Sequence, residues 1–249
     1  MGCFLKKVFI SGASGGIGKQ VAKEFLDNGY FVIAHYNKNK DGINELFDYA
    51  YSKGVNENLY AVQMDLSNLE EVKKGLELLS KSFKSIDIVI NNAGVGLYKL
   101  ITETTLTDWE KVFNINMTSA YQITNAFIGG MIDKHFGRII NISSMWGLVG
   151  ASMEVCYSAS KSALIGYTKA LAKELAPNNI TVNCICPGVI DTPINARFSS
   201  EDMLALKEQT PLGRIGLPSD ISKLVYFLSS DSSSFITGQV ISVDGGFSL

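Results

Sequence analysis

Short runs of hydrophobic residues recur along the chain, separated by longer segments in which hydrophobic residues return every three to four positions. The runs lie at residues 7–11, 31–35, 59–64, 87–91, 138–143, 181–186 and 240–243. Several are almost uninterrupted, which is typical of parallel strands that helices cover on both faces. Between the first two runs, Ile17, Val21 and Phe25 share one helical face, and Gly29 follows as a stop. This alternation predicts an α/β fold, a doubly wound parallel sheet of about seven strands with helices on both faces.

No change of composition divides the chain. Residues 1–249 contain no linker-like segment, internal repeat or low-complexity tract, so we expect a single domain. Residues 190–213 have weak strand character and read as a loop and helical insertion. Beyond the carboxyl end of a strand in a doubly wound sheet, such an insertion can cover the ligand crevice.

Composition and charge exclude several classes of partner. Hydrophobic residues make up 46% of the chain and charged residues 18%, with a formal net charge of −2. This leaves no basic surface for nucleic acid or anionic lipid, so we expect neither a nucleic-acid nor a membrane partner. No uninterrupted apolar run approaches the roughly 18 residues that a spanning helix needs.

The cysteines and histidines show no metal-binding pattern. The four cysteines lack Cys-x-x-Cys or Cys/His spacing, and the two histidines stand alone in the sequence. We expect no metal, buried free thiols at Cys184 and Cys186, and a reduced, cytoplasmic location. Gly2 and Cys3 hint at acylation, but Lys6 stands where that motif favours Ser or Thr, so we expect none.

The segment SGASGGIG, residues 11–18, follows the first strand and opens the first helix. Glycines there permit a tight turn and let the backbone approach a pyrophosphate at the helix N-terminus. The spacing differs from the commoner Gly-x-Gly-x-x-Gly, and a glycine-rich turn without a ligand is the alternative. NNAG, residues 91–94, ends the fourth strand, and Asp65 follows the third, at the same sheet edge. We therefore expect a nucleotide site, with Asp65 accepting a hydrogen bond from adenine.

The end of the second strand indicates which nicotinamide cofactor binds. NAD-binding chains place an acid there for the ribose 2′-hydroxyl, whereas this chain has Tyr36 followed by Asn37 and Lys38. A carboxylate would repel a 2′-phosphate and Lys38 would attract it. This favours NADP(H), with NAD(H) as the alternative, although lysines in a solvated loop would look the same.

Tyr157 and Lys161 lie one turn apart on a predicted helix. An ammonium beside a tyrosine lowers the cost of ionising the phenol and makes it able to give or take a proton. Such pairs are also common on solvated helix surfaces. Ser144 favours the chemical interpretation, because it ends the fifth strand at the crevice edge and could hold a substrate carbonyl beside the tyrosine.

The glycine segment, Asn91–Gly94, Ser144, Tyr157-x-x-x-Lys161 and Pro187-Gly188 together resemble the classical short-chain dehydrogenases/reductases in residue type, order and spacing. The resemblance extends through ITGQVISVDGG, residues 236–246. It implies a Rossmann fold and an NAD(P)-dependent oxidoreductase that transfers hydride to a substrate carbonyl. Within this family the sequence most resembles the bacterial 3-oxoacyl-[acyl-carrier-protein] reductases, which act in fatty acid biosynthesis.

The resemblance also implies roles for individual residues. Tyr157 would be the general acid/base, Ser144 would orient the substrate, and Lys161 would bind the ribose and lower the tyrosine pKa. Asn116, seven residues after Trp109, would fix a water of the proton relay. The residues expected to contact the cofactor are Gly12, Ser14, Gly15, Gly16, Ile17, Gly18, Tyr36, Asn37, Lys38, Asp65, Leu66, Asn92, Ala93, Gly94, Tyr157, Lys161, Pro187, Gly188, Ile190 and Thr192.

Some residues depart from the acyl-carrier-protein reductases. Gly15 stands where those enzymes commonly carry an arginine, and His135 and Asn178 replace the arginines thought to dock the carrier. Glu154 would place a carboxylate in the substrate pocket, which suits a hydroxylated substrate better than a thioester. Trp146 either walls that pocket or packs in the core.

These departures leave three hypotheses. The first is a 3-oxoacyl-[acyl-carrier-protein] reductase, acting on an acyl thioester with acyl carrier protein as partner. The second is a sugar, polyol or small-alcohol dehydrogenase, and the third is an idle nucleotide-binding regulatory protein. The resemblance also implies a homotetramer in which helices near 100–125 and 157–175 pair, although a buried intrachain face would give the same pattern.

Overall fold

The computed structural model describes residues 5–195 and 198–249 and contains a seven-stranded, entirely parallel sheet. The strand order is β3-β2-β1-β4-β5-β6-β7. The strands are β1 (Lys7–Ile10), β2 (Phe31–Tyr36), β3 (Leu59–Gln63), β4 (Ile88–Asn91), β5 (Gly137–Ile142), β6 (Ile180–Pro187) and β7 (Val240–Val243). The predicted α/β Rossmann fold is confirmed, and the predicted strands differ from the observed ones by at most one residue at each end.

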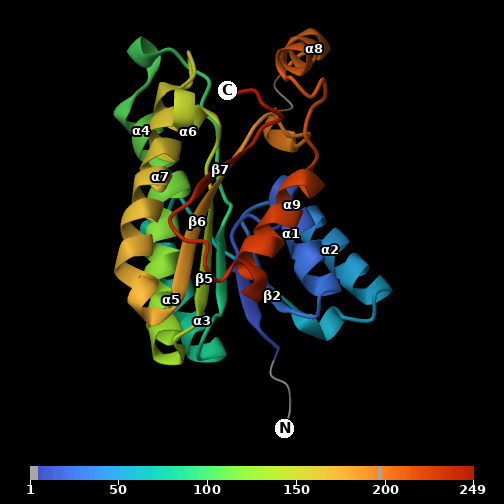
Figure 1. Cartoon of the computed structure of the whole chain (residues 1–249), viewed down its shortest axis with the longest axis vertical. Coiled ribbons are helices and arrows are strands. Elements are labelled where there is room, and N and C mark those ends of the chain that lie inside the picture. Colours follow the sequence, from blue (N-terminus) through green and yellow to red (C-terminus); the bar gives the residue numbers. More distant parts are fainter. Residues whose placement is uncertain (1–4, 196–197) are drawn as a thin grey trace.

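Helices cover both faces of this sheet (Figure 1). On one side lie α1 (Gly16–Asp27), α2 (Lys40–Ser52) and α9 (Pro218–Ser229). On the other lie α3 (Leu69–Phe83), α4 (Leu106–Phe113), α5 (Ser119–Lys134), α6 (Trp146–Val149) and α7 (Val155–Leu175). Two separate hydrophobic clusters pack against the sheet, one on each face, beneath the helices that cover that face. Burial on both faces explains the uninterrupted apolar runs, since β4, β5 and β6 have no solvent-facing side.

The order in which successive strands are added to the sheet reverses between β1 and β4. The connections run outward through β2 and β3 on one side of this point, and through β5, β6 and β7 on the other. Ligands of doubly wound sheets bind where the strand order reverses, beyond the carboxyl ends of the strands. The glycine segment follows β1 and the NNAG segment follows β4, so both lie at this switch point.

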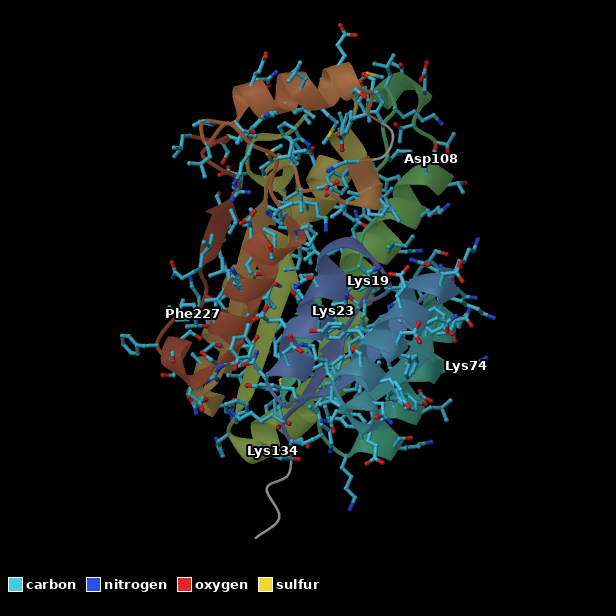
Figure 2. The ribbon with its side chains drawn as sticks, turned by 90° about the vertical axis from the view of Figure 1, so that its right-hand side faces the viewer. Lys19, Lys23, Lys74, Asp108, Lys134 and Phe227 are labelled. Carbon is cyan, nitrogen blue, oxygen red and sulfur yellow. The ribbon has the colours of Figure 1, made fainter. Side chains whose placement is uncertain are left out.

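Hydrogen bonds join the two ends of the insertion expected after β6. Ile190 and Gly216 form an isolated parallel bridge, with Asp191 N donating to Gly216 O at 2.8 Å and Gly216 N to Val189 O at 2.9 Å. Between these ends the insertion contains α8 (Ser200–Gln209), which stands apart from both helix layers at the end of the molecule where the chain's C-terminus lies (Figures 1 and 2).

Two sequence expectations concern membranes and acylation. Within residues 5–195 and 198–249, every helix is too short or too polar to cross a bilayer. Gly2 and Cys3, on which the acylation argument depends, lie outside the described residues.

Candidate active site

A cavity of about 530 Å³ opens beyond the carboxyl ends of the strands at the switch point. Its wall contains most of the residues predicted for the cofactor and the chemistry. From the glycine segment onward these are Gly12, Ser14, Gly15, Gly16, Ile17, Asn37, Lys38, Asp65, Leu66, Asn92, Ala93, Gly94, Ser144, Trp146, Glu154, Tyr157, Lys161, Pro187, Gly188, Ile190 and Thr192. The fold therefore brings segments from distant parts of the chain to one cavity.

Three of the predicted residues lie outside the cavity wall. Tyr36 packs against the hydrophobic cluster beneath α1 and α2, Gly18 is buried within α1, and Asn116 is buried behind the wall. Strand alternation explains why the Tyr36 side chain lies outside the cavity wall. Adjacent side chains on β2 point to opposite faces, and the neighbours His35 and Asn37 line the cavity instead.

The glycine segment forms a cradle that has no room for side chains at its base. Gly12 has φ +68°, and a Cβ on Gly18 would lie 2.2 Å from the carbonyl oxygen of Gly12. Helix α1 begins at Gly16 without a side-chain cap, and Gly15, Gly16 and Ile17 at its start line the cavity. Backbone donors at a bare helix N-terminus fit a pyrophosphate. The residues present thus fit a dinucleotide cofactor.

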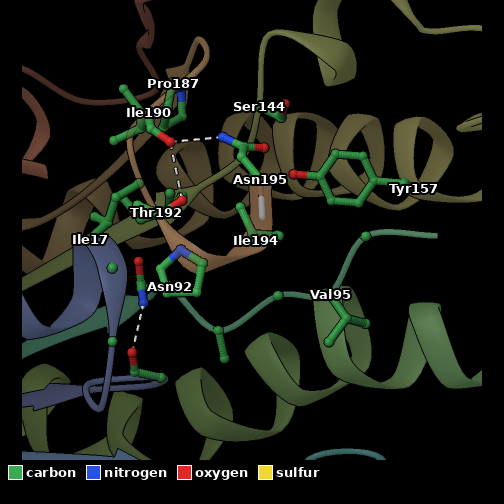
Figure 3. A pocket seen from close by; sticks show the side chains of 18 of the residues that line it. Ile17, Asn92, Val95, Ser144, Tyr157, Pro187, Ile190, Thr192, Ile194 and Asn195 are labelled. Atoms are coloured by element: carbon green, nitrogen blue, oxygen red, sulfur yellow. Dashed lines mark hydrogen bonds between the residues drawn. The ribbon is translucent and has the colours of Figure 1, made fainter. Parts of the chain in front are cut away.

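Asn92 holds this cradle against the end of β4. Its Nδ2 donates to Ser11 O at 3.0 Å and to Gly12 O at 3.2 Å, one of which is drawn in Figure 3. Ser11 Oγ accepts from the N–H groups of Asn92 and Ala93, at 3.0 Å each. The two segments predicted independently from the sequence are therefore bonded into one unit.

Tyr157 and Ser144 line the cavity on the side away from the glycine cradle. The Tyr157 hydroxyl points into the cavity from α7, towards the side on which Ser144 and Asn195 lie (Figure 3). Ser144 follows β5, and its Oγ accepts from Trp146 N at 3.1 Å, which leaves its proton free to donate to a substrate oxygen. A tyrosine and a serine converging on one space can bind a carbonyl oxygen and protonate it.

Lys161 is buried below Tyr157. Its Nζ donates to Ile142 O at 2.8 Å and lies 5.8 Å from the centre of the Tyr157 ring. Burial lowers the pKa of Lys161 to about 8, so the ammonium form predominates at neutral pH. A Cβ at Gly94 would lie 3.0 Å from this Nζ, so a glycine at position 94 leaves room for the lysine.

Asn116 lies in a π-helical turn, Asn114–Thr118, that joins α4 to α5. Its amide exchanges two hydrogen bonds with the Val95 backbone, at 2.8 and 3.0 Å, and donates to Ser160 Oγ at 2.9 Å. Ser160 Oγ in turn donates to Tyr157 O at 2.7 Å. Asn116 therefore supports the helix that carries Tyr157, and π-turns of this kind are frequent at functional sites.

The sequence interpretation missed several residues of the cavity. They include His35, Asn39, Val95, Gly96, Met145, Ile194, Asn195, Phe198 and Leu206. Asn39 Nδ2 donates to Ser14 O at 2.8 Å and so fixes the glycine segment to the start of α2. Asn195 Nδ2 donates to Ile190 O at 2.7 Å (Figure 3). The alternation of side chains along β2 could have predicted that His35 lines the cavity. Positions 35 and 36 are adjacent on the strand, so their side chains point to opposite faces of the sheet.

His35 is only 2% exposed, and burial lowers its pKa from 6.5 to about 4. Between these two values the unfolded chain binds a proton that the folded chain excludes. We therefore expect the free energy of unfolding to fall by roughly 3 kcal/mol on this account as the pH drops from 6.5 to about 4. Urea denaturation at stepped pH, with His35→Asn beside the wild type, measures this contribution. Equal pH slopes in the two proteins would contradict it.

The chain is similar to known proteins over nearly its whole length. A family model described as Enoyl-(Acyl carrier protein) reductase matches residues 12–248. The 3-oxoacyl-[acyl-carrier-protein] reductase FabG of Aquifex aeolicus strain VF5 is 39% identical over 97% of this chain and 96% of its own. An uncharacterised oxidoreductase of Bacillus subtilis strain 168, YmfI, is 37% identical over 97% of this chain and 98% of its own. The crystal structure of YwfH, an NADPH dependent reductase involved in bacilysin biosynthesis, superposes with a TM-score of 0.91 at 27% identity, covering 98% of both chains.

Proposed function

Because the chain belongs to the short-chain dehydrogenase/reductase family, we propose that it is an NADPH-dependent reductase of 3-oxoacyl thioesters carried on acyl carrier protein. The observation that carries this proposal is the single cavity in which the glycine cradle adjoins Tyr157, Ser144 and Lys161. The similarity to the Aquifex aeolicus protein supports the substrate class, since that protein is a 3-oxoacyl-[acyl-carrier-protein] reductase.

In the proposed mechanism each side chain acts on the substrate oxygen or on its neighbour. The hydride that reduces the carbonyl carbon would come from a nicotinamide cofactor bound along the glycine cradle. Ser144 donates a hydrogen bond to the substrate oxygen, and Tyr157 donates the proton as negative charge develops there. The Lys161 ammonium favours the tyrosinate that remains. Asn116 and Ser160 hold the backbone of Tyr157 in place.

The cofactor would lie along the glycine cradle and the ends of β2, β3 and β4. Gly12, Gly16 and Ile17 would face the pyrophosphate, and Asp65 and Leu66 the adenine. The Asp65 carboxylate also accepts from Ser67 N and Oγ, at 2.9 and 2.7 Å. Those bonds lower the pKa of Asp65 and keep it an acceptor.

Lys38 would select NADPH over NADH. It is an exposed lysine in the cavity wall, next to where a ribose 2′-phosphate would lie. We expect Lys38→Glu to lower the preference for NADPH over NADH roughly tenfold, because a carboxylate there repels the phosphate. Dissociation constants for both cofactors, from fluorescence titration, measure this. Lys40→Glu, two residues away and outside the cavity wall, is the control, and an equal change in both variants would refute the role of Lys38.

A sugar, polyol or small-alcohol dehydrogenase is the second candidate function. The buried carboxyl group of Glu154, 4% exposed in the cavity wall, favours it, since hydroxyl groups donate to carboxylates. His135 and Asn178, at the positions thought to dock acyl carrier protein, stand beside the amino ends of β5 and β6, away from the cavity.

A substrate panel separates the candidates. Acetoacetyl thioester with NADPH or NADH is assayed against sugars and polyols with NADP⁺ or NAD⁺. We expect thioester reduction with NADPH to have the highest kcat/KM. Faster oxidation of a sugar or polyol would establish the second function, and NADPH binding without turnover on the whole panel would indicate a regulatory nucleotide-binding protein.

We also propose a homotetramer. Exposed hydrophobic residues gather on α4, α5 and α7 and on the segment before α4; they include Leu100, Ile101, Leu106, Tyr121 and Val155. Burying them between copies would remove them from water. Sedimentation velocity tests the assembly, and a monomer at micromolar concentration would refute it.

A further inference from the structure

His35 is a buried imidazole in the wall of the cofactor half of the cavity, and the mechanism above does not use it. It lies near the carboxyl end of β2, with its ring stacked at 6.4 Å on that of Phe9 from the neighbouring β1. Among the described residues, Asp65, after β3, is the charged group that acts on the ring, and it favours the protonated form only weakly beside the effect of burial.

Both ring nitrogens of His35 have partners on other strands. Gly12 N, at the base of the glycine cradle, donates to Nδ1 at 3.1 Å. Nε2 lies 3.0 Å from Met64 O, just beyond the end of β3. The ring therefore ties the cradle to the segment that would hold the adenine.

These partners determine the tautomer. Gly12 N–H can only donate and Met64 O can only accept. Nδ1 must therefore be unprotonated and Nε2 must carry the proton, which is the neutral ring. A protonated ring would set two donors, Nδ1–H and Gly12 N–H, against each other.

His35 and Asn92 together hold every polar group of the two peptide units around Gly12. His35 Nδ1 accepts from Gly12 N, and His35 O accepts from Ala13 N at 2.8 Å. Asn92 Nδ2 donates to Ser11 O and Gly12 O on the opposite side. Because Gly12 itself allows many backbone conformations, these outside contacts select the one that the cradle needs.

We propose that His35 is a positioning residue for the cofactor, which sets the orientation of the Gly12 peptide through Nδ1 and so preorganises the glycine cradle for the pyrophosphate. A preordered cradle loses less conformational entropy when the cofactor binds. The proposal rests on the dinucleotide cofactor assigned above but not on the identity of the substrate.

Two substitutions test the two nitrogens separately. His35→Asn places an amide Oδ1 where the imidazole Nδ1 lies and keeps an acceptor for Gly12 N–H. The longer side chain of His35→Gln reaches the position of Nε2 and leaves Gly12 N–H without its acceptor.

In the full-length protein we expect His35→Asn to bind NADPH within threefold of the wild type. We expect His35→Gln and His35→Leu to bind it at least tenfold more weakly, with kcat at saturating NADPH changed less than twofold. Affinities are measured by fluorescence titration below the onset of melting of each variant.

Nitrogen-15 NMR of the wild-type ring gives an independent test that needs no variant to fold. At pH 7 the proposal requires an unprotonated Nδ1 and a protonated Nε2, before and after NADPH is added. The opposite tautomer, or equal affinities for NADPH in His35→Asn and His35→Gln, would overturn the role of His35. Wild-type protein that binds neither NADPH nor NADH would overturn the proposed function and this role together, whereas normal wild-type binding with equal variants overturns only the role of His35.

Discussion

Replacing Tyr157 with phenylalanine should lower kcat about a thousandfold while leaving the affinity for NADPH within threefold of the wild type. Only the hydroxyl is removed, and that hydroxyl is the proposed proton donor, which points into the cavity that Ser144 also lines (Figure 3). Loss of a positioned general acid costs between about a hundredfold and ten-thousandfold in rate. The ring still packs above Lys161 and the cradle is untouched, so cofactor binding should persist.

Steady-state kinetics with a saturating substrate, together with fluorescence titration of NADPH, measure the two expectations separately. Tyr167→Phe is the matched control, because Tyr167 lies on the same helix but outside the cavity wall and should keep near-normal turnover. If Tyr157→Phe retained more than a few per cent of the wild-type rate, Tyr157 would not be the acid.

The second large effect is expected from one added methyl group in the cradle. In Gly18→Ala the new Cβ would lie 2.2 Å from the Gly12 carbonyl oxygen and 2.5 Å from Asn92 Nδ2, so the backbone must shift. That shift would break the contacts by which Asn92 holds Gly12. We expect NADPH affinity to fall at least a hundredfold, with a loss of stability of roughly 1–3 kcal/mol typical of overpacking.

Gly15→Ala provides the comparison within the same segment. Its Cβ would meet only Asn39 Nδ2, at 3.6 Å, which is an ordinary contact, and its backbone is extended. This variant should bind NADPH nearly as the wild type does. Calorimetric titration and thermal melting of the two variants test the difference, and equal losses would mean that glycine matters here through flexibility and not through close approach.

The fold was predictable because its signals are local and repeated. Seven apolar runs alternate with amphipathic segments, and uninterrupted runs such as Ile88–Ile90 of β4 require cover on both faces. The outline of the site was predictable for the same reason, since Gly12, Gly94 and Ser144 each follow a strand and parallel strands bring their carboxyl ends together.

Contacts between distant segments were not predictable. Tyr36 was placed at the cofactor, but the phase of β2 turns it into the core and turns His35 to the cavity. Asn116 came only from the family resemblance, because nothing near it in the sequence shows that its amide meets Val95 and Ser160. Contacts of this kind depend on how the helix layers pack against the sheet. The periodicity of a single segment carries no information about that packing.

The closed neck of the insertion after β6 makes that segment an exchangeable unit. Because Val189–Asp191 and Gly216 bond to each other, the chain leaves the scaffold and returns to it at neighbouring points. Residues between them, among them Ile194, Asn195 and Phe198, supply one wall of the cavity, whereas Tyr157, Lys161 and the cradle come from other elements. Grafting the corresponding segment from a relative should therefore change which carbonyl is accepted without rebuilding the catalytic groups. The substrate range of related chains would then diverge mainly through changes within this insertion, with few changes elsewhere in the chain.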